Sequence, residues 1–321
     1  MLSILLPVNG HSVYFAPTVS SVSRASSFFG QQTELVIVLN QVSEFEKKQI
    51  ENDLQLYPYA TKIFTSEADN LAQVLNEGLK ECSFEFVARM DQDDICHETR
   101  FRSQWEYMEK NSGVALVGGQ VMLIDPDGFG IGRANYPTRP KILSKRLTSG
   151  NCFAHPAVMF RKSAVLEKGG YRNNFPIAED YDLWVRLNKD WSLSNLSSYV
   201  LDYRIHPTQI SSSSFNLQLC STIEIIANQL NLLSPKLINQ LNPFKGNSDD
   251  KIVRQILRIP FLTNHKKLLG RVALMILRRG SKYTKHTFFF DFHLLGIAIV
   301  FNPLETILTL VGALRNRLFK S

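Results

Sequence analysis

Three carboxylates, Asp91, Asp93 and Asp94, stand within four residues directly after an apolar run. Like charges this close repel and raise each other's pKa unless a cation or hydrogen-bond donors lie among them. In an extended segment residues i and i+2 point the same way, so Asp91 and Asp93 can converge on one ion. Mg²⁺ and Mn²⁺ take oxygen ligands and commonly share carboxylates with substrate phosphates. The spacing predicts a metal and diphosphate site; the alternative is a solvated turn.

A second acidic pair, Glu179 and Asp180, opens a helix predicted over residues 178–190. Moving a group off a diphosphate requires neutralisation of the leaving charge, which a metal supplies. It also requires a base on the opposite face of the reacting centre to take the acceptor's proton. One carboxylate of this pair is a candidate for that base. The alternative is that both acids only stabilise the helix N-terminus.

The elements that position these residues alternate along the first part of the chain. Short apolar runs predict buried strands, and a Ser43–Glu46 capping pair and spaced leucines predict helices. The expected strands are 3–8, 34–40, 62–66 and 84–91, and the expected helices are 43–57 and 70–82. Alternating strands and helices predict a largely parallel α/β sheet, whose ligands gather at the carboxyl ends of strands. Asp91 falls at such an end.

Further elements follow the acidic triplet. A helix is expected to begin near residue 98, and Asp94 is expected to cap it. A strand and turn are expected at 115–130, a strand at 199–206, and mostly helices from residue 215 onward. The four cysteines are far apart and form no CxxC pair, so neither a zinc site nor a disulfide framework is expected, and a reducing cytoplasm is the default. The N-terminal apolar run is short and is interrupted by Pro7, which favours a first strand over a signal peptide.

Four segments occur in an order that resembles the bacterial family 2 glycosyltransferases that build surface polysaccharides. They are "ARMDQDDICHETRFRSQWEYMEKN", "HPAVMFRKSAVLEKGGYR", "AEDYDLWVRL" and "YRIHPTQIS". The resemblance implies a GT-A fold, Rossmann-like with a mostly parallel sheet, and a helical C-terminal extension. It implies a glycosyltransferase domain over 1–214, with a donor half at about 1–125 and an acceptor half at about 126–214. It also implies a nucleotide-diphosphate sugar donor, Mn²⁺ or Mg²⁺, and inversion at the anomeric carbon.

The resemblance also implies roles for single residues. Asp93 is expected to be the main metal ligand, with Asp91 sharing the metal or contacting the ribose. His206 matches a histidine that reaches the metal or diphosphate; a packed loop histidine is the alternative. Asp180 is expected to be the base. Towards the acceptor it implies Glu179 or Trp184, and it places His155 in a segment that resembles the family's acceptor-side wall. A hydrogen-bonding structural role is the alternative for His155.

On the donor side, "LLPVNG" resembles the end of the family's first strand, where the backbone of Pro7, Val8 and Asn9 lies against the nucleobase. After the second strand this chain has "LNQVSEF" where relatives usually carry an Asp-Asp-Gly-Ser stretch that reads the uracil. Asn40 can still hydrogen-bond a base, which leaves a UDP-, thymidine- or guanosine-linked sugar open. The other expected donor-binding residues are Arg89, with a simple salt bridge as the alternative, and Asn76.

The C-terminal region from 215 to 321 is expected to be a separate, basic and mostly helical part. Residues 251–321 hold 13 Lys or Arg residues against 2 acids, although the net charge of the whole chain is only +7. Basic amphipathic helices are typical of anionic membrane surfaces, so residues 251–314 are predicted to associate with the membrane. An ordinary solvated face is the alternative, and no nucleic-acid recognition motif is present. The predicted location is the inner face of the cell membrane, as a peripheral protein.

The predicted function is an inverting transfer of a sugar to a lipid-linked or growing glycan acceptor. Two alternatives come from other classes. A haloacid-dehalogenase-type phosphatase also uses D-x-D after a strand, but near the chain start and with a different order of partners. A catalytically inactive GT-A scaffold is motivated by the altered "LNQ" stretch, and the intact "DQDD" and "AEDYD" segments argue against it.

Overall fold

The computed structural model describes residues 1–207 and 215–245, together with residues 262, 265, 268, 269, 271 and 272. The chain divides into two compact units. The first comprises Met1–Leu147 and Asn151–Ser213, and the second comprises Thr148–Gly150 and Ser214–Ser321. Every predicted site residue belongs to the first unit.

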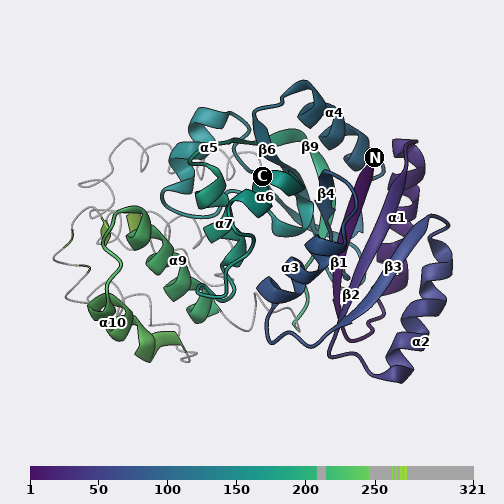
Figure 1. The fold of residues 1–321 in the computed structure, drawn as a ribbon, viewed down its shortest axis with the longest axis horizontal. Coiled ribbons are helices and arrows are strands. Elements are labelled where there is room, and N and C mark those ends of the chain that lie inside the picture. Colours follow the sequence, from purple (N-terminus) through teal and green to yellow (C-terminus); the bar gives the residue numbers. More distant parts are fainter. Residues whose placement is uncertain (208–214, 246–261, 263–264, 266–267, 270, 273–321) are drawn as a thin grey trace. The chain divides into compact units, whose positions relative to one another are not determined.

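The first half of this unit is a parallel sheet with helical crossovers (Figure 1). Its strands lie in the order β3-β2-β1-β4, and each neighbouring pair is parallel. The strands are β1 (Leu2–Asn9), β2 (Thr33–Asn40), β3 (Ala60–Ser66) and β4 (Phe86–Arg89); the helices between them are α1 (Phe15–Phe29), α2 (Glu44–Asp53) with the 3-10 turn η1 (Leu54–Leu56), and α3 (Leu71–Glu81). The predicted elements of this half are therefore confirmed.

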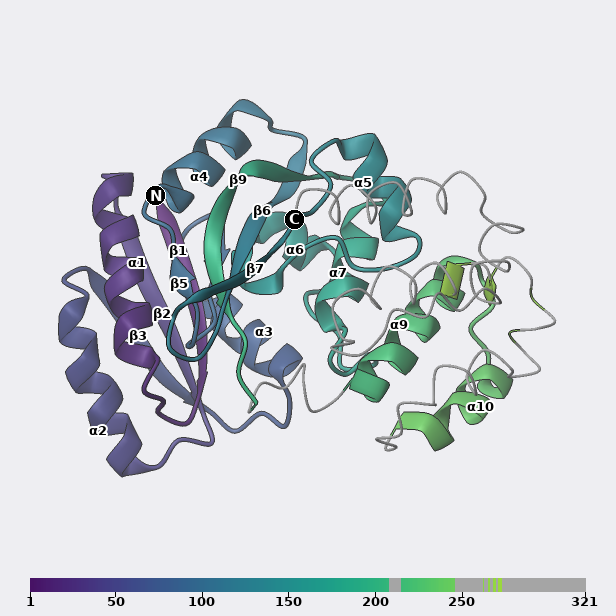
Figure 2. The ribbon, with the colours of Figure 1, turned by 180° about the vertical axis from the view of Figure 1, so that it is seen from behind.

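Both faces of β1, β2 and β4 are covered, which explains their largely apolar sequences, whereas β3 at the sheet edge is mostly exposed. Side chains alternate along β1: Ile4 and Leu6 pack in a core cluster with Val19 of α1. On the opposite face Leu5 lies against Gly78 of α3, where the absence of a Cβ lets helix and sheet approach closely. Helices α1 and α3 thus cover opposite faces of the sheet (Figures 1 and 2).

The second half of the unit continues the same sheet with mixed pairing. The order continues β4-β8-β6-β9-β5, with β7 paired to β6. β6 and β9 are parallel, whereas β4–β8, β8–β6, β9–β5 and β6–β7 are antiparallel. The strands are β5 (Ile95–Cys96), β6 (Val114–Ile124), β7 (Gly130–Ala134), β8 (Met159–Arg161) and β9 (Ser192–Arg204); the helices are α4 (Arg100–Lys110), α5 (Pro140–Leu147), η2 (His155–Ala157), α6 (Lys162–Glu167) and α7 (Glu179–Leu187). The strand β9 is longer than predicted, and the sequence pattern did not reveal β5 or α5.

In the second unit the structure describes two longer helices, α9 (Phe215–Gln229) and α10 (Pro235–Lys245). They pack on each other, and Lys245 of α10 pairs with the buried Glu224 of α9 at 2.9 Å. The predicted membrane-associating segment 251–314 lies outside the described residues except for a few isolated positions. Within the described residues, no helix combines the length and apolar character needed to cross a bilayer.

Candidate active site

The carboxyl ends of β1, β2 and β4 meet at one edge of the sheet. Asn9, the last residue of β1, is in register with Asn40, the last residue of β2. β4 pairs on the other side of β1 and ends at Arg89, so that Asp91 follows the strand by two residues. Parallel strands therefore bring the predicted donor-side residues to the edge where the acidic triplet begins, as expected for a ligand site in such a sheet.

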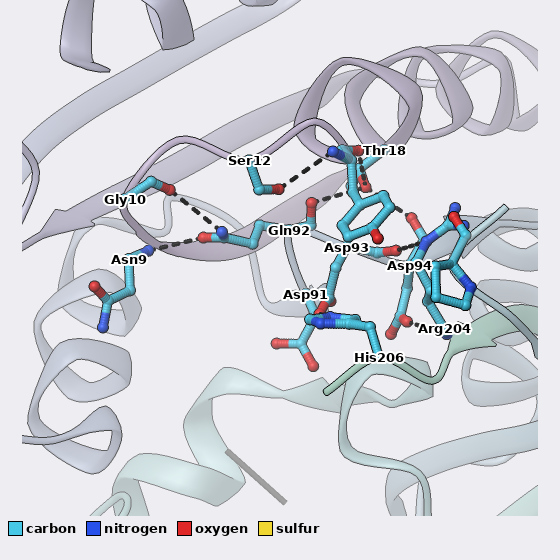
Figure 3. A network of polar contacts seen from close by, with 12 residues as sticks. Asn9, Gly10, Ser12, Thr18, Asp91, Gln92, Asp93, Asp94, Arg204 and His206 are labelled. Carbon is cyan, nitrogen blue, oxygen red and sulfur yellow. Dashed lines mark hydrogen bonds and ion pairs between the residues drawn. The ribbon is translucent and has the colours of Figure 1, made fainter. Parts of the chain in front are cut away.

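The loop of residues 91–94, here called the acidic loop, holds its carboxylates close together. One oxygen from each of Asp91, Asp93 and Asp94 lies within 4.8 Å of the others. Arg89 Nη2 pairs with Asp91 Oδ1 at 2.5 Å. His206 Nε2 lies 2.8 Å from Asp93 Oδ2, and both of these residues appear in Figure 3. The sequence predicted a common metal site for Asp91, Asp93 and His206, and the fold brings these three residues to one place from β4 and from the end of β9.

The electrostatics of the acidic loop favour a bound cation. Burial raises the pKa of Asp91 above its ordinary value, the Asp93 charge raises it further, and Arg89 opposes both. Burial, together with the charges of Asp93 and Asp91, raises the pKa of Asp94 well above its ordinary value. A divalent cation would offset this repulsion, and carboxylate oxygens are the ligands that Mn²⁺ and Mg²⁺ prefer. Asp91 and Asp93, with His206, therefore fit a hard divalent ion.

Asp94 has a different role from the one predicted. Helix α4 begins at Arg100 with Thr99 before it, and β5 lies between Asp94 and the helix, so the prediction that Asp94 caps this helix is wrong. The Asp94 side chain is instead fully buried, and its Oδ1 accepts the backbone N–H of Arg204 at 2.8 Å. Its Oδ2 is buried with no hydrogen-bond partner within the described chain. Asp94 therefore ties the acidic loop to β9.

Gln92 and Arg204 hold the acidic loop from two directions (Figure 3). Gln92 faces away from the carboxylates: its Oε1 accepts the N–H of Asn9 at 2.7 Å, and its Nε2 donates to Gly10 O at 3.3 Å. Arg204 Nε donates to Asp93 O at 2.8 Å. The same guanidinium donates through Nη1 to Pro126 O at 2.9 Å, in the turn after β6. The loop is thus fixed to β1, β6 and β9 together.

The second acidic pair opens α7, as predicted. Asn151 Nδ2 donates to Asp180 Oδ2 at 2.6 Å, which fixes the direction of this carboxylate. Asp180 is close enough to Asp91 for its charge to raise the pKa of that group. The base candidate and the acidic loop therefore belong to one site, although they are 89 positions apart in the sequence.

Burial and the neighbouring Asp180 charge raise the pKa of Glu179 from 4.5 to about 7. The folded state then holds this proton more tightly than the unfolded state. The resulting stabilisation is fully present below about pH 4.5 and is lost as the pH rises through about 7. We therefore expect Glu179→Gln to gain unfolding free energy relative to the wild type between about pH 5 and pH 8, measured by urea denaturation. Glu98→Gln, at an exposed position, is the control. If the difference in unfolding free energy between Glu179→Gln and the wild type stayed constant across this pH range, the prediction would be contradicted.

The residues predicted to bind the acceptor occupy the wall of the site. His155 Nε2 lies 3.0 Å from the Tyr171 hydroxyl, and burial together with the Arg89 charge holds the pKa of His155 well below its usual range. The Trp184 side chain is fully buried and packs edge-on against Phe153, His155 and Tyr171. A fully buried ring has no surface to offer an acceptor, so we do not retain Trp184 among the residues that contact one.

Several predicted donor-side residues also have structural partners. Asn76 donates to Tyr171 O at 2.8 Å and accepts the Tyr171 N–H at 2.9 Å, so both ends of its amide fix the loop before α7. Asn40 Nδ2 donates to Ala68 O at 2.8 Å. The Val8 side chain is buried in the core, while Asn9 beside it is exposed. The Asn9 side chain is therefore accessible at this edge of the sheet, whereas the Val8 side chain is not.

Arg89 forms a salt bridge with Asp91. This is the alternative to diphosphate binding that the sequence analysis gave for Arg89. Its side chain is buried, and its Nε and Nη1 have no hydrogen-bond partner in the described part of the chain. Its charge acts on His155, Tyr171 and Glu179 as well as on Asp91. Arg89 therefore lies between the acidic loop and the residues that open α7.

Sequence reasoning missed the residues that hold the site together. They are Thr18, Gln92, Arg204, Asn151 and Tyr171. Gln92, Arg204 and Tyr171 lie inside segments that carried the resemblance, whereas Asn151 lies outside them. The polar side chains of Gln92 and Arg204, close in sequence to the predicted ligands, were the available signal. No feature of the sequence pointed to Thr18, because a threonine in an amphipathic helix does not reveal which carbonyl groups its hydroxyl contacts.

A Rossmann-like sheet with a carboxylate cluster beyond β4 and a second acidic pair opening a later helix defines a GT-A glycosyltransferase. The comparisons agree: the chain matches the description "Glycosyl transferase family 2" over residues 3–169. This protein belongs to glycosyl transferase family 2. The predicted GT-A fold and the predicted class of enzyme are therefore confirmed, and the phosphatase alternative is excluded.

Individual relatives extend this comparison. The O-antigen biosynthesis glycosyltransferase WbnJ of Escherichia coli is 34% identical over 232 residues, covering 70% of this chain and 87% of its own length. The E. coli UDP-Gal:alpha-D-GlcNAc-diphosphoundecaprenol beta-1,3-galactosyltransferase is 35% identical over 147 residues, covering 44% of this chain and 52% of its own. Among solved structures, the mannosyltransferase PcManGT from Pyrobaculum calidifontis in complex with GDP-Man and Mn²⁺ has a TM-score of 0.52 at 12% identity, covering 100% of this chain and 88% of its own.

Proposed function

We propose that this protein is an inverting, metal-dependent glycosyltransferase that moves a sugar from a nucleotide-diphosphate donor to a lipid-linked or growing glycan acceptor in surface polysaccharide synthesis. The observation that carries the proposal is the juxtaposition of Asp91 with Asp180, one beyond the strand β4 and the other opening α7. The similarity to WbnJ supports the surface-polysaccharide assignment. The name of the E. coli galactosyltransferase supports a UDP-linked donor and an acceptor on a lipid diphosphate.

On the donor side, Asp91, Asp93 and His206 would hold Mn²⁺ or Mg²⁺. A bound divalent ion supplies Lewis-acid neutralisation of the charge that develops on the leaving diphosphate. The Mn²⁺ in the PcManGT complex supports this choice of ion. Arg89 opposes the rise in the pKa of Asp91 that burial causes, because the nearby guanidinium favours the charged carboxylate. Asn9 and Asn40, at the ends of β1 and β2, lie where the nucleoside would contact the sheet edge.

On the acceptor side, Asp180 takes the proton from the attacking hydroxyl. Asn151 Nδ2 donates to Asp180 Oδ2 at 2.6 Å, and this hydrogen bond orients the Asp180 carboxylate for the proton transfer. Glu179, with its pKa near 7, carries its proton for part of the time at neutral pH and so limits the negative charge beside the base. A single displacement by a base-activated hydroxyl inverts the anomeric configuration, because attack and departure occur on opposite faces of the carbon.

The proposal is tested by incubating the full-length protein with a panel of UDP-, GDP- and dTDP-sugars, Mn²⁺ and an extract of lipid-linked acceptors. Release of nucleoside diphosphate is followed, and the anomeric configuration of the product is read by NMR. Donor-dependent release and a product of inverted configuration support the proposal. A protein that neither binds nor turns over any donor would leave the inactive-scaffold alternative in place.

Membrane association through residues 251–314 remains a prediction from sequence. The excess of Lys and Arg in this region is the basis, since each basic residue near an anionic surface contributes about 1 kcal/mol. We expect the full-length protein to sediment with phosphatidylglycerol vesicles at low salt, and less with neutral phosphatidylcholine vesicles. Equal sedimentation with both vesicle types, or none with either, would contradict the prediction.

A further inference from the structure

We infer that residues 14–18, at the start of α1, are a positioning element that sets the geometry of the metal-binding carboxylates. The inference rests on the metal dependence proposed above. The contacts that carry the inference are those of Tyr14 and Thr18. Neither residue is a predicted ligand: Thr18, labelled in Figure 3, acts through the acidic loop, and Tyr14 acts through His206 and Arg204.

Thr18 contacts the main chain on both sides of Asp93. Its Oγ1 lies 3.0 Å from Gln92 O and 2.8 Å from Asp94 O, and both contacts span more than 70 residues of sequence. It is also 2.9 Å from Tyr14 O, one turn earlier in the same helix region. A threonine hydroxyl has a single proton to donate, so these carbonyl groups share it. Thr18 is fully buried, so its hydroxyl is shielded from bulk solvent.

Arg204 completes this arrangement by donating from Nε to Asp93 O at 2.8 Å. The three consecutive carbonyl groups of the acidic loop at residues 92, 93 and 94 are therefore all within hydrogen-bond distance of a fixed side chain. The direction of a Cα–Cβ bond follows from the backbone that carries it. Fixing these peptide planes consequently fixes the direction in which the Asp93 side chain leaves the main chain, and the contact with His206 then restricts its carboxylate.

Tyr14 acts on the other predicted ligand. Its ring centroid lies 5.3 Å from the His206 ring, and Arg204 Cζ lies 4.5 Å from the Tyr14 ring centroid. The Tyr14 ring thus contacts both the imidazole that faces Asp93 and the guanidinium that holds Asp93 O. Such a contact restricts the His206 ring and benefits from the cation–π attraction of Arg204.

Together these contacts keep the two ligand groups in place before any ion arrives. Residues that orient metal ligands without touching the ion typically change metal affinity about 10- to 100-fold when they are removed. The expected signature is therefore weaker metal binding with all ligand residues retained. A residue that only stabilises the fold would not produce this signature at temperatures where the variant is folded.

The test measures Mn²⁺ binding to the full-length protein by EPR of the free ion, with Mn²⁺ alone and with added UDP. Thr18→Val keeps the shape of the side chain and removes the hydroxyl, and we expect about tenfold weaker binding. Thr18→Ser restores the hydroxyl and should restore the affinity. Ser26→Ala is the matched control, because Ser26 is a buried hydroxyl on the same helix whose partner is Tyr57.

A second pair of variants keeps the test decisive if Thr18→Val does not fold. We expect Tyr14→Leu to weaken Mn²⁺ binding about tenfold and Tyr14→Phe, which retains the ring, to bind as the wild type does. Folded Thr18→Val and Tyr14→Leu variants with wild-type affinity would overturn the inference. A wild-type protein that binds no Mn²⁺ under either condition would overturn the proposed metal dependence itself.

Discussion

Replacing Asp93 by alanine is expected to lower the turnover number about a thousandfold while the protein stays folded. Asp93 is the carboxylate that faces His206, and its side chain is partly exposed, unlike the fully buried Asp94. A bound metal contributes several kcal/mol to the stabilisation of the leaving charge. Because each 1.4 kcal/mol is a factor of about ten, its loss corresponds to about three decades in rate. The measurement is release of nucleoside diphosphate at saturating donor, over a titration of Mn²⁺.

The control for this variant is Asp127→Ala, which removes an exposed carboxylate from the turn after β6 and leaves the acidic loop intact. Asp127→Ala should retain wild-type turnover with the same Mn²⁺ dependence. Circular dichroism shows whether Asp93→Ala is folded. Full activity of Asp93→Ala, with an unchanged Mn²⁺ requirement, would contradict the assignment of Asp93 as a ligand.

The parallel half of the sheet was predictable because its sequence signals are local. Continuous apolar runs predicted β1 and β2, and the Ser43–Glu46 capping box that predicted α2 is present with both of its hydrogen bonds. The order β3-β2-β1-β4 then follows from the chain rules of α/β folds. The place of Asp91 at the sheet edge follows from that order, so the position of the candidate metal site was also available from sequence.

The mixed half was less predictable because its signals are not local. β5 has only two residues and exists because it pairs with β9, more than 100 residues later. The prediction that Asp94 caps a helix failed for the same reason. An acid shortly before a helix is a cap signal, but here β5 intervenes and Arg204 supplies the partner from β9.

The residues that position the site could not be identified from residue types alone. The motif "AEDYDLW" marks an acidic helix start, but it does not distinguish residues that face a ligand from residues that face the core. Asp180 and Trp184 lie one turn apart, and the first belongs to the site whereas the second is fully buried. Likewise Thr18 and Arg204 act on the acidic loop across long stretches of sequence, and only the folded chain brings them there.

Replacing Asp180 by asparagine is expected to lower kcat about 10²- to 10⁴-fold, the range by which general base catalysis typically accelerates a reaction. Asparagine has nearly the same shape but cannot accept a proton from the acceptor hydroxyl. Since Asp180 is not among the predicted metal ligands, the affinities for Mn²⁺ and for the donor should stay close to those of the wild type. The measurement combines steady-state rates with direct binding of donor and Mn²⁺.

This separation of kcat from binding distinguishes a base from a residue that merely shapes the site. Asp190→Asn is the control, because Asp190 is a carboxylate just beyond the other end of α7, paired with Lys168 on the surface. Asn151→Ala should give a smaller loss of kcat than Asp180→Asn, because it removes the donor that orients Asp180 Oδ2 but keeps the base. If Asp180→Asn instead kept kcat and lost donor affinity, Asp180 would be a donor-binding residue. Glu179 would then become the candidate base, because Asp182, the third carboxylate of α7, is buried and paired with Arg186.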